Sequence, residues 1–142
     1  MSDMVEIRKL LSANDVGLTG AHQVGILVPK ERHILQFFPA LDHSLLNPRS
    51  TVHVIDEQNV PWLLMFIYYN NALVAGGTRN EYRLTRMTRF FRSHDVAAGD
   101  TLCFWKAGDH TRIRVIRASS TKELEDSVIR HSGKWHVARC SR

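Results

Sequence analysis

The chain has 142 residues, 44% of them hydrophobic and 23% charged, and it carries a formal net charge of +5. This length favours a single domain over residues 1–142 whose core needs no disulfide or metal, and the composition excludes a fibrous or disordered chain. A membrane-spanning helix is also excluded, because it needs about 20 consecutive apolar residues and the longest apolar stretch, Val60–Tyr69, is interrupted by Pro61.

Short apolar segments separated by turn residues predict a mainly β fold. Gly99-Asp100 and Gly108-Asp109 are expected turns, the second within a hairpin. Two short helices are expected over Pro29–Phe38 and Thr121–His131. In chain order, the predicted strands are Val5–Leu10, Gln23–Val28, Thr51–Ile55, Trp62–Asn70, Asn80–Thr85, Thr101–Trp105, Thr111–Ala118 and Trp135–Ala138. This pattern is typical of a β-barrel or a β-sandwich.

The N-terminal region contains acidic and amide side chains that a signal peptide lacks. The two cysteines, Cys103 and Cys140, lie far apart and define neither a disulfide framework nor a zinc site. We therefore expect a cytoplasmic protein with reduced thiols and no membrane association.

Catalytic motifs are missing from the sequence. No lysine has an acid two residues before it, as many metal-dependent nucleases require, and no two histidines have the helical i, i+4 spacing of metal ligands. There is also no phosphate-binding glycine loop and no nucleophile elbow. We expect this chain to have no catalytic residues, no metal ligands and no cofactor.

The segment over residues 12–23 is rich in small and polar residues and lies between two predicted strands. Its glycines permit close approach to a ligand, and Asn14, Asp15, His22 and Gln23 offer both donors and acceptors. The alternative is a polar hairpin loop with an Asx-turn at Asn14-Asp15.

Positive charge is concentrated between Arg79 and Arg92. This window has five arginines and one acid, Glu81, so the window carries +4 of the net charge. Such a concentration indicates a polyanionic partner, although a solvated arginine-rich loop would have the same composition. If the chain is extended here, Arg79, Glu81 and Arg83 share one face. Arginine matches the guanine edge and glutamate accepts from the cytosine amino group. Glu81 therefore indicates either base selection or a role in holding the arginines.

A helix is the alternative for the same window, because Arg83, Arg86, Arg89 and Arg92 recur every three residues.

Two stretches, LSANDVGLTGAHQVGILVP and GGTRNEYRLTR, resemble the N-terminal effector domain of the EcoRII restriction endonuclease family. A third, FFRSHDVAAGDTLCFW, is similar to the plant B-three transcription factors, which share that domain's fold. The resemblance implies a seven-stranded open pseudobarrel with two short helices. It also implies two arms that grip the major groove of double-stranded DNA. Family members closest to this pattern read 5′-CCWGG, where W is A or T.

The resemblance also assigns candidate DNA-binding residues. The set of candidates includes Gln23, Tyr82 and Arg86 because they lie within the two stretches that resemble the effector domain. Two further arginines, Arg89 and Arg92, lie outside these stretches and are expected to contact phosphates without base preference. The full set is Lys9, Ser12, Asn14, Asp15, Thr19, His22 and Gln23 in the first arm, and Arg79, Asn80, Glu81, Tyr82, Arg83 and Arg86 in the second.

Three positions depart from the family pattern. Gly77 and Tyr82 stand where the family has basic residues, and Met87 stands where it has a tryptophan. These departures affect expected backbone contacts and affinity more than the base-reading set.

The resemblance favours a sequence-specific DNA reader that serves a type II restriction endonuclease as its effector domain and is fused to a separate catalytic domain. A transcription-regulator module of the same fold is the alternative, and a self-sufficient nuclease is a third possibility that the missing motifs disfavour. We expect a monomer on DNA, because the two arms differ and each can meet one half of a five-pair site.

Overall fold

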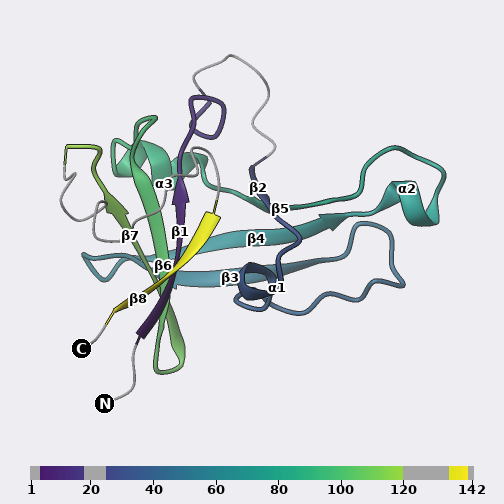
Figure 1. Ribbon diagram of the computed structural model, residues 1–142, viewed down its shortest axis with the longest axis horizontal. Coiled ribbons are helices and arrows are strands. Elements are labelled where there is room, and N and C mark those ends of the chain that lie inside the picture. The colour runs from purple at the N-terminus through teal and green to yellow at the C-terminus, as the bar shows by residue number, and fades with distance from the viewer. Residues whose placement is uncertain (1–3, 18–24, 120–134, 141–142) are drawn as a thin grey trace.

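The computed structural model describes residues 4–17, 25–119 and 135–140, which form one bent β-sheet with three short helices (Figure 1). The prediction of a mainly β fold is confirmed, and each of the eight segments predicted as strands overlaps an observed strand. The strands are β1 Met4–Leu10, β2 Ile26–Val28, β3 Arg49–Ile55, β4 Pro61–Tyr69, β5 Glu81–Thr85, β6 Thr101–Ala107, β7 His110–Ile116 and β8 Trp135–Cys140. The described residues therefore form eight strands, one more than the family resemblance implied.

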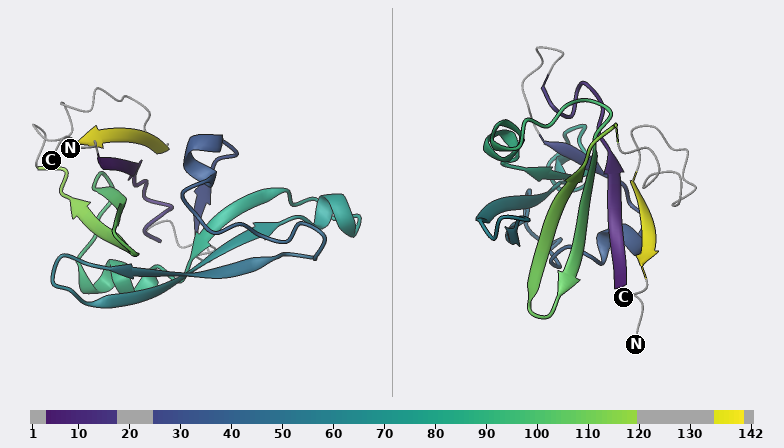
Figure 2. Two further views of the ribbon diagram at one scale, coloured as in Figure 1. Left: turned by 90° about the horizontal axis from the view of Figure 1, so that it is seen from below. Right: turned by 90° about the vertical axis from the view of Figure 1, so that its left-hand side faces the viewer.

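The strand order is β2-β5-β4-β3-β7-β6-β1-β8, so β2 and β8 are the two edges. Neighbouring strands are antiparallel except β3 and β7, which pair in parallel through Val54–Thr111 and Ile55–Arg112. Figure 2 (right) shows β7, β6, β1 and β8 side by side at one end of the molecule. The expected hairpin at Gly108-Asp109 joins β6 to β7.

The two edges approach each other because of Trp135. This β8 residue is 5% exposed, and its indole Nε1 donates to the carbonyl oxygen of Leu27 on β2 at 2.8 Å. Its ring stacks on Phe104 and meets Phe38 edge-on, each at a centroid distance of 6.0 Å. An aromatic ring with a polar edge suits this position, because it fills the core and also satisfies a backbone carbonyl. The sheet is thereby nearly closed into a barrel.

The core lies on the concave face of the sheet, where period-two alternation places one residue in every two. Its largest buried members on the strands are Ile7, Ile26, Leu64, Phe66, Leu84, Leu102, Phe104 and Ile113. Burial of each such side chain stabilises the fold by about 1.5–3 kcal/mol.

The helices differ from the sequence prediction. The helix expected over Pro29–Phe38 is confined to α1, Arg32–Leu35, and the helix expected over Thr121–His131 lies outside the described residues. α2, Asn71–Val74, at the end of the β4–β5 arm, was not expected. The alternative of a helix through Arg83, Arg86, Arg89 and Arg92 holds only for its second half, because Glu81–Thr85 is the strand β5 and α3 spans Thr88–Ser93. No helix of the described residues is long and apolar enough to cross a membrane.

Replacing Trp135 with phenylalanine tests the closure. Trp135→Phe keeps an aromatic ring against Phe104 but removes the donor to Leu27, so the free energy of unfolding should fall by about 1–2 kcal/mol, measured by urea denaturation. Trp105→Phe on β6 is the control, because the Trp105 indole makes no hydrogen bond to any described residue. An equal loss for both variants would contradict a closing role for the indole.

Candidate nucleic-acid interface

Two segments project from the barrel in Figure 1. The first is the loop after β1, whose described part reaches Gly17 and rises at the top of the view. The second is the β4–β5 arm, which extends to the right and carries α2 at its end. We call these the first loop and the second arm. They coincide with the two stretches that the sequence singled out.

The first loop is shaped by Asp15. Its carboxylate Oδ2 lies 3.0 Å from the Lys9 Nζ and accepts from the Ser12 backbone N–H at 2.9 Å. In return, the Asp15 N–H donates to the Ser12 Oγ at 3.2 Å. This reciprocal pair resembles a capping box and fixes the turn. Both Lys9 and Asp15 are buried, so their ionic groups serve first to hold the loop.

The remaining candidates of the first loop are only partly placed. Asn14 is exposed at the turn. Thr19, His22 and Gln23 lie outside the described residues, as does the start of the strand predicted from Gln23. The structure therefore places Lys9, Ser12, Asn14 and Asp15 together in one loop.

The tip of the second arm is built around Asn71. Its Oδ1 accepts from the Arg79 N–H at 2.7 Å, its backbone carbonyl accepts from the Gly77 N–H at 2.8 Å, and the next residue, Ala72, donates its N–H to the Arg79 carbonyl at 2.9 Å. A Cβ at position 77 would lie 2.6 Å from the Asn71 Oδ1. A larger residue would therefore require the Asn71 amide to shift away from the Arg79 N–H, which gives the first departure from the family pattern a structural role.

Arg79, just before β5, forms one row with Glu81 and Arg83 of β5, as the alternation predicted, and we call these three residues the reading row. The Arg79 Nε lies 3.6 Å from the Glu81 Oε1, and the Arg83 Nε donates to the other carboxylate oxygen. All three side chains are part-exposed, with between 19% and 33% of their surface accessible. Glu81 therefore bridges two guanidinium groups at the surface.

Each arginine of the row has a second support. The Arg79 guanidinium lies over the Tyr69 ring with its Cζ 3.7 Å from the centroid, a favourable cation–π geometry. The Arg83 Nη1 donates to the Gly25 carbonyl at 3.0 Å. Gly25 lies just before β2 with a φ of +95°, and a Cβ there would meet the Leu84 carbonyl oxygen at 2.4 Å. The row is thus held before any ligand binds.

Electrostatics keep the row charged. Partial burial raises the pKa of Glu81, but the hydrogen bond and charge of Arg83, together with those of Arg79, outweigh it and lower the pKa below its ordinary value. The carboxylate is therefore ionised throughout the neutral range, and the row carries two positive charges and one negative charge.

Tyr82 lies on the opposite face of β5 from the reading row. Its ring stacks on Tyr68 at 4.2 Å and on Phe66 at 5.5 Å, and its hydroxyl lies 2.9 Å from the His43 Nε2. Burial and the neighbouring Tyr68 raise the pKa of Tyr82. At this second departure from the family pattern, the tyrosine therefore has a structural role in an aromatic stack.

Asn80 presents donors rather than acceptors. Its Oδ1 accepts from the Tyr68 hydroxyl, and its amide nitrogen has no protein partner among the described residues, so two N–H groups remain available. Arg86 follows β5 in the left-handed conformation, with φ +66°, and is exposed. Met87, the third departure, is 1% exposed in the core beneath α3.

Sequence reasoning missed the residues that position the row. The backbone or side chains of the row are contacted by Asn71, Tyr69 and Gly25. These contacts became visible only once the folded structure was known. The one signal in the sequence was strand alternation, which allowed the face of the predicted strand on which Tyr69 lies to be assigned. Across the described ranges no group of three or more histidine, cysteine, aspartate or glutamate side chains could hold a metal ion.

Comparison with known proteins gives a consistent result. A family model described as the N-terminal domain of the restriction endonuclease EcoRII matches residues 1–129. The type II restriction enzyme EcoRII of Escherichia coli is 36% identical over 129 residues, which covers 84% of this chain and 31% of that enzyme. The chain therefore spans about a third of the length of the curated relative it matches.

Substitution of Asp15 separates a loop-shaping role from a ligand contact. Asp15→Asn removes the charge paired with buried Lys9, so the free energy of unfolding should fall by about 2–3 kcal/mol, measured by urea denaturation. Ser12→Ala is the matched control, since it removes one neutral hydrogen bond and should cost about 1 kcal/mol. Unchanged stability in Asp15→Asn, with lowered affinity for a ligand, would show that the carboxylate contacts the ligand instead.

Proposed function

The chain belongs to the family of EcoRII restriction endonuclease N-terminal domains, and from this premise we propose that it binds double-stranded DNA sequence-specifically as an effector domain. The first loop and the second arm enter the major groove and read base edges. Cleavage belongs to a separate catalytic domain of the natural protein.

The reading row is the observation that carries this proposal. Two guanidinium groups flank a carboxylate on one strand face, which matches the guanine acceptors O6 and N7 and the cytosine amino donor. A carboxylate in a basic surface weakens non-specific attraction to phosphates. Its presence at the centre of the row therefore supports selection of bases over simple charge attraction.

The geometry of the second arm supports entry into a groove. β2 pairs with β5 only from Tyr82 to Leu84, so no strand among the described residues covers this edge of the arm beyond Tyr82. Asn80, Glu81 and Arg79 lie on that part. A two-stranded ribbon fits the major groove, which is about 12 Å wide. Asn80 then offers its two N–H groups to acceptors on a base or a phosphate.

We further propose 5′-CCWGG as the target and a monomer as the binding unit. The target is inferred from the resemblance of both stretches to family members that read it.

The monomer is inferred from the difference between the arms. The first loop is largely neutral and polar, whereas the second arm is rich in arginine. Two unlike arms can meet the two halves of a short site without a two-fold dimer.

The proposal is tested by measuring affinity for a 5′-CCWGG duplex and for a scrambled duplex of equal length. Arg79→Ala and Arg83→Ala should each weaken cognate binding by about 1–3 kcal/mol and relax the preference at one G·C pair. Ultracentrifugation on a single site should give one chain per duplex. Equal loss of affinity for both duplexes would make these arginines phosphate contacts, and a 2:1 complex would reject the monomer.

Glu81→Gln distinguishes a base contact from a purely supporting role. It removes the carboxylate that bridges Arg79 and Arg83 and that can accept from cytosine, so cognate affinity should fall by about 1–3 kcal/mol. Affinity for scrambled duplex should stay unchanged or rise, because a repulsive charge is lost. Fluorescence anisotropy on both duplexes measures this. Equal tightening on both would show that Glu81 reads no base.

A further inference from the structure

The arginines of this chain fall into two groups. Most of those with defined contacts are tied to acidic residues or to backbone oxygens: Arg8 and Arg114 to Glu6, Arg79 and Arg83 to Glu81, Arg112 to the Asp56 carbonyl, and Arg117 to Asp100. By contrast, Arg86, Arg89 and Arg92 are exposed, and none has an acidic partner within the described ranges. These three lie on and just before α3, and we call them the α3 arginine face.

The helix holds this face in a defined orientation. Its opposite side is buried, since Phe90 is 0% and Phe91 6% exposed, and Met87 packs beneath its first turn. Arg89 and Arg92 are spaced i, i+3 and therefore neighbour each other on the helix surface. No acidic residue lies in the first turn to offset their charge. Like charges at this spacing destabilise the free protein, so the face is suited to an anion.

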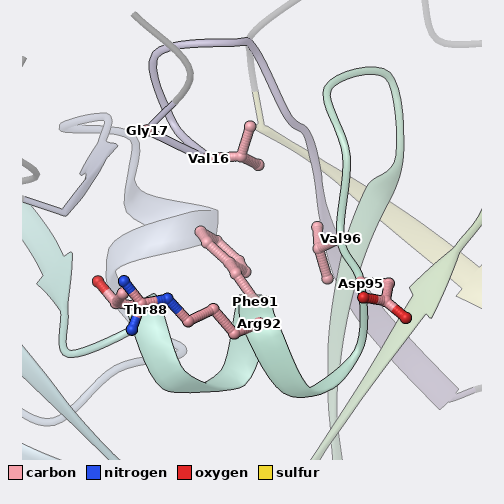
Figure 3. A pocket seen from close by; sticks show the side chains of 7 residues that line it. All are labelled: Val16, Gly17, Thr88, Phe91, Arg92, Asp95 and Val96. Carbon is pink, nitrogen blue, oxygen red and sulfur yellow. The ribbon is translucent and has the colours of Figure 1, made fainter. Parts of the chain in front are cut away.

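The face is continuous with both parts of the candidate interface. Arg86 directly follows β5, only three residues after Arg83 of the reading row. At the other end, Arg92 and Thr88 line a hollow together with Val16 and Gly17 of the first loop. Figure 3 shows this hollow, with Phe91 pointing from α3 toward Val16 and the Arg92 side chain running along the helix toward Thr88.

A second hollow also borders α3. It is lined by Arg86, Thr88 and Arg89 together with the start of β4. Thr88 therefore borders both hollows, the first together with Arg92 and the second together with Arg86 and Arg89. Arginine forks and a hydroxyl are the donors that bind phosphate oxygens in proteins. The three guanidinium groups are donors only, and Asp95, which also lines the first hollow, forms no ion pair with Arg92 in the described part of the chain.

We propose that the α3 arginine face binds phosphates of the DNA backbone outside the base pairs that the two arms read. This inference rests on the proposed function. The α3 arginine face would be a flanking contact surface that raises affinity for DNA of any sequence. It lies next to the reading row, whose carboxylate lowers such non-specific affinity. The bound duplex is consequently longer than the recognised site.

The test compares a short duplex that ends just outside the recognised pairs with one extended by a helical turn, about 10 base pairs, at each end. The full chain, Arg89→Gln/Arg92→Gln and a control, Arg32→Gln, are titrated with both duplexes over a range of salt concentrations. Arg32 is an exposed arginine on α1 and is remote in sequence from α3. Melting temperatures are measured for all three proteins.

The wild type should bind the extended duplex more tightly than the short one. The double variant should lose this gain, and its log–log salt slope on the extended duplex should flatten by about two units. Its preference for cognate over scrambled sequence should not change. Arg32→Gln should behave as the wild type, and unchanged melting temperatures would exclude misfolding.

Two results would overturn the inference. Retention of the flank gain and the salt slope in the double variant would show that the face does not touch the backbone. Loss of cognate preference on the short duplex would place these arginines in the reading surface instead. If the wild type bound no duplex of any sequence, the proposed function itself would fail, an outcome distinct from both.

Discussion

The hydrogen bond from the Trp135 indole to the Leu27 carbonyl, 2.8 Å long, joins the two edges of a sheet that no backbone ladder closes. Because Leu27 belongs to the three-residue strand β2, this bond fixes the short strand that has the fewest ladder contacts of its own. Gly25 lies two residues before Leu27, and its carbonyl accepts from Arg83. Closure of the barrel and placement of the reading row are therefore linked through one edge strand.

The charges of the interface are divided between two tasks. At the reading row, Glu81 neutralises part of the arginine charge, which reduces attraction to any phosphate but leaves oriented donors and acceptors. On α3, we propose that arginines without acidic partners in the described ranges supply sequence-independent attraction. A protein that must search non-specific DNA and then select one site needs both properties. Separating them on adjacent elements lets each be tuned without disturbing the other.

The residues at the three departures from the family pattern all have structural roles. Gly77 lies against the Asn71 amide, Tyr82 belongs to an aromatic stack with Tyr68, and Met87 fills the core below α3. None of the three side chains belongs to the reading row. The proposed base-reading residues of the second arm are therefore compatible with these substitutions.

The sequence by itself determined the strands, the Gly108-Asp109 hairpin and the shared face of Arg79, Glu81 and Arg83, because period-two alternation and turn chemistry act between near neighbours. Only the tertiary structure decided which edges meet, since Leu27 and Trp135 are 108 positions apart. It also decided that Asp15 pairs with buried Lys9 and that α3 borders the first loop. These features depend on burial and on contacts between distant segments, which local patterns do not encode.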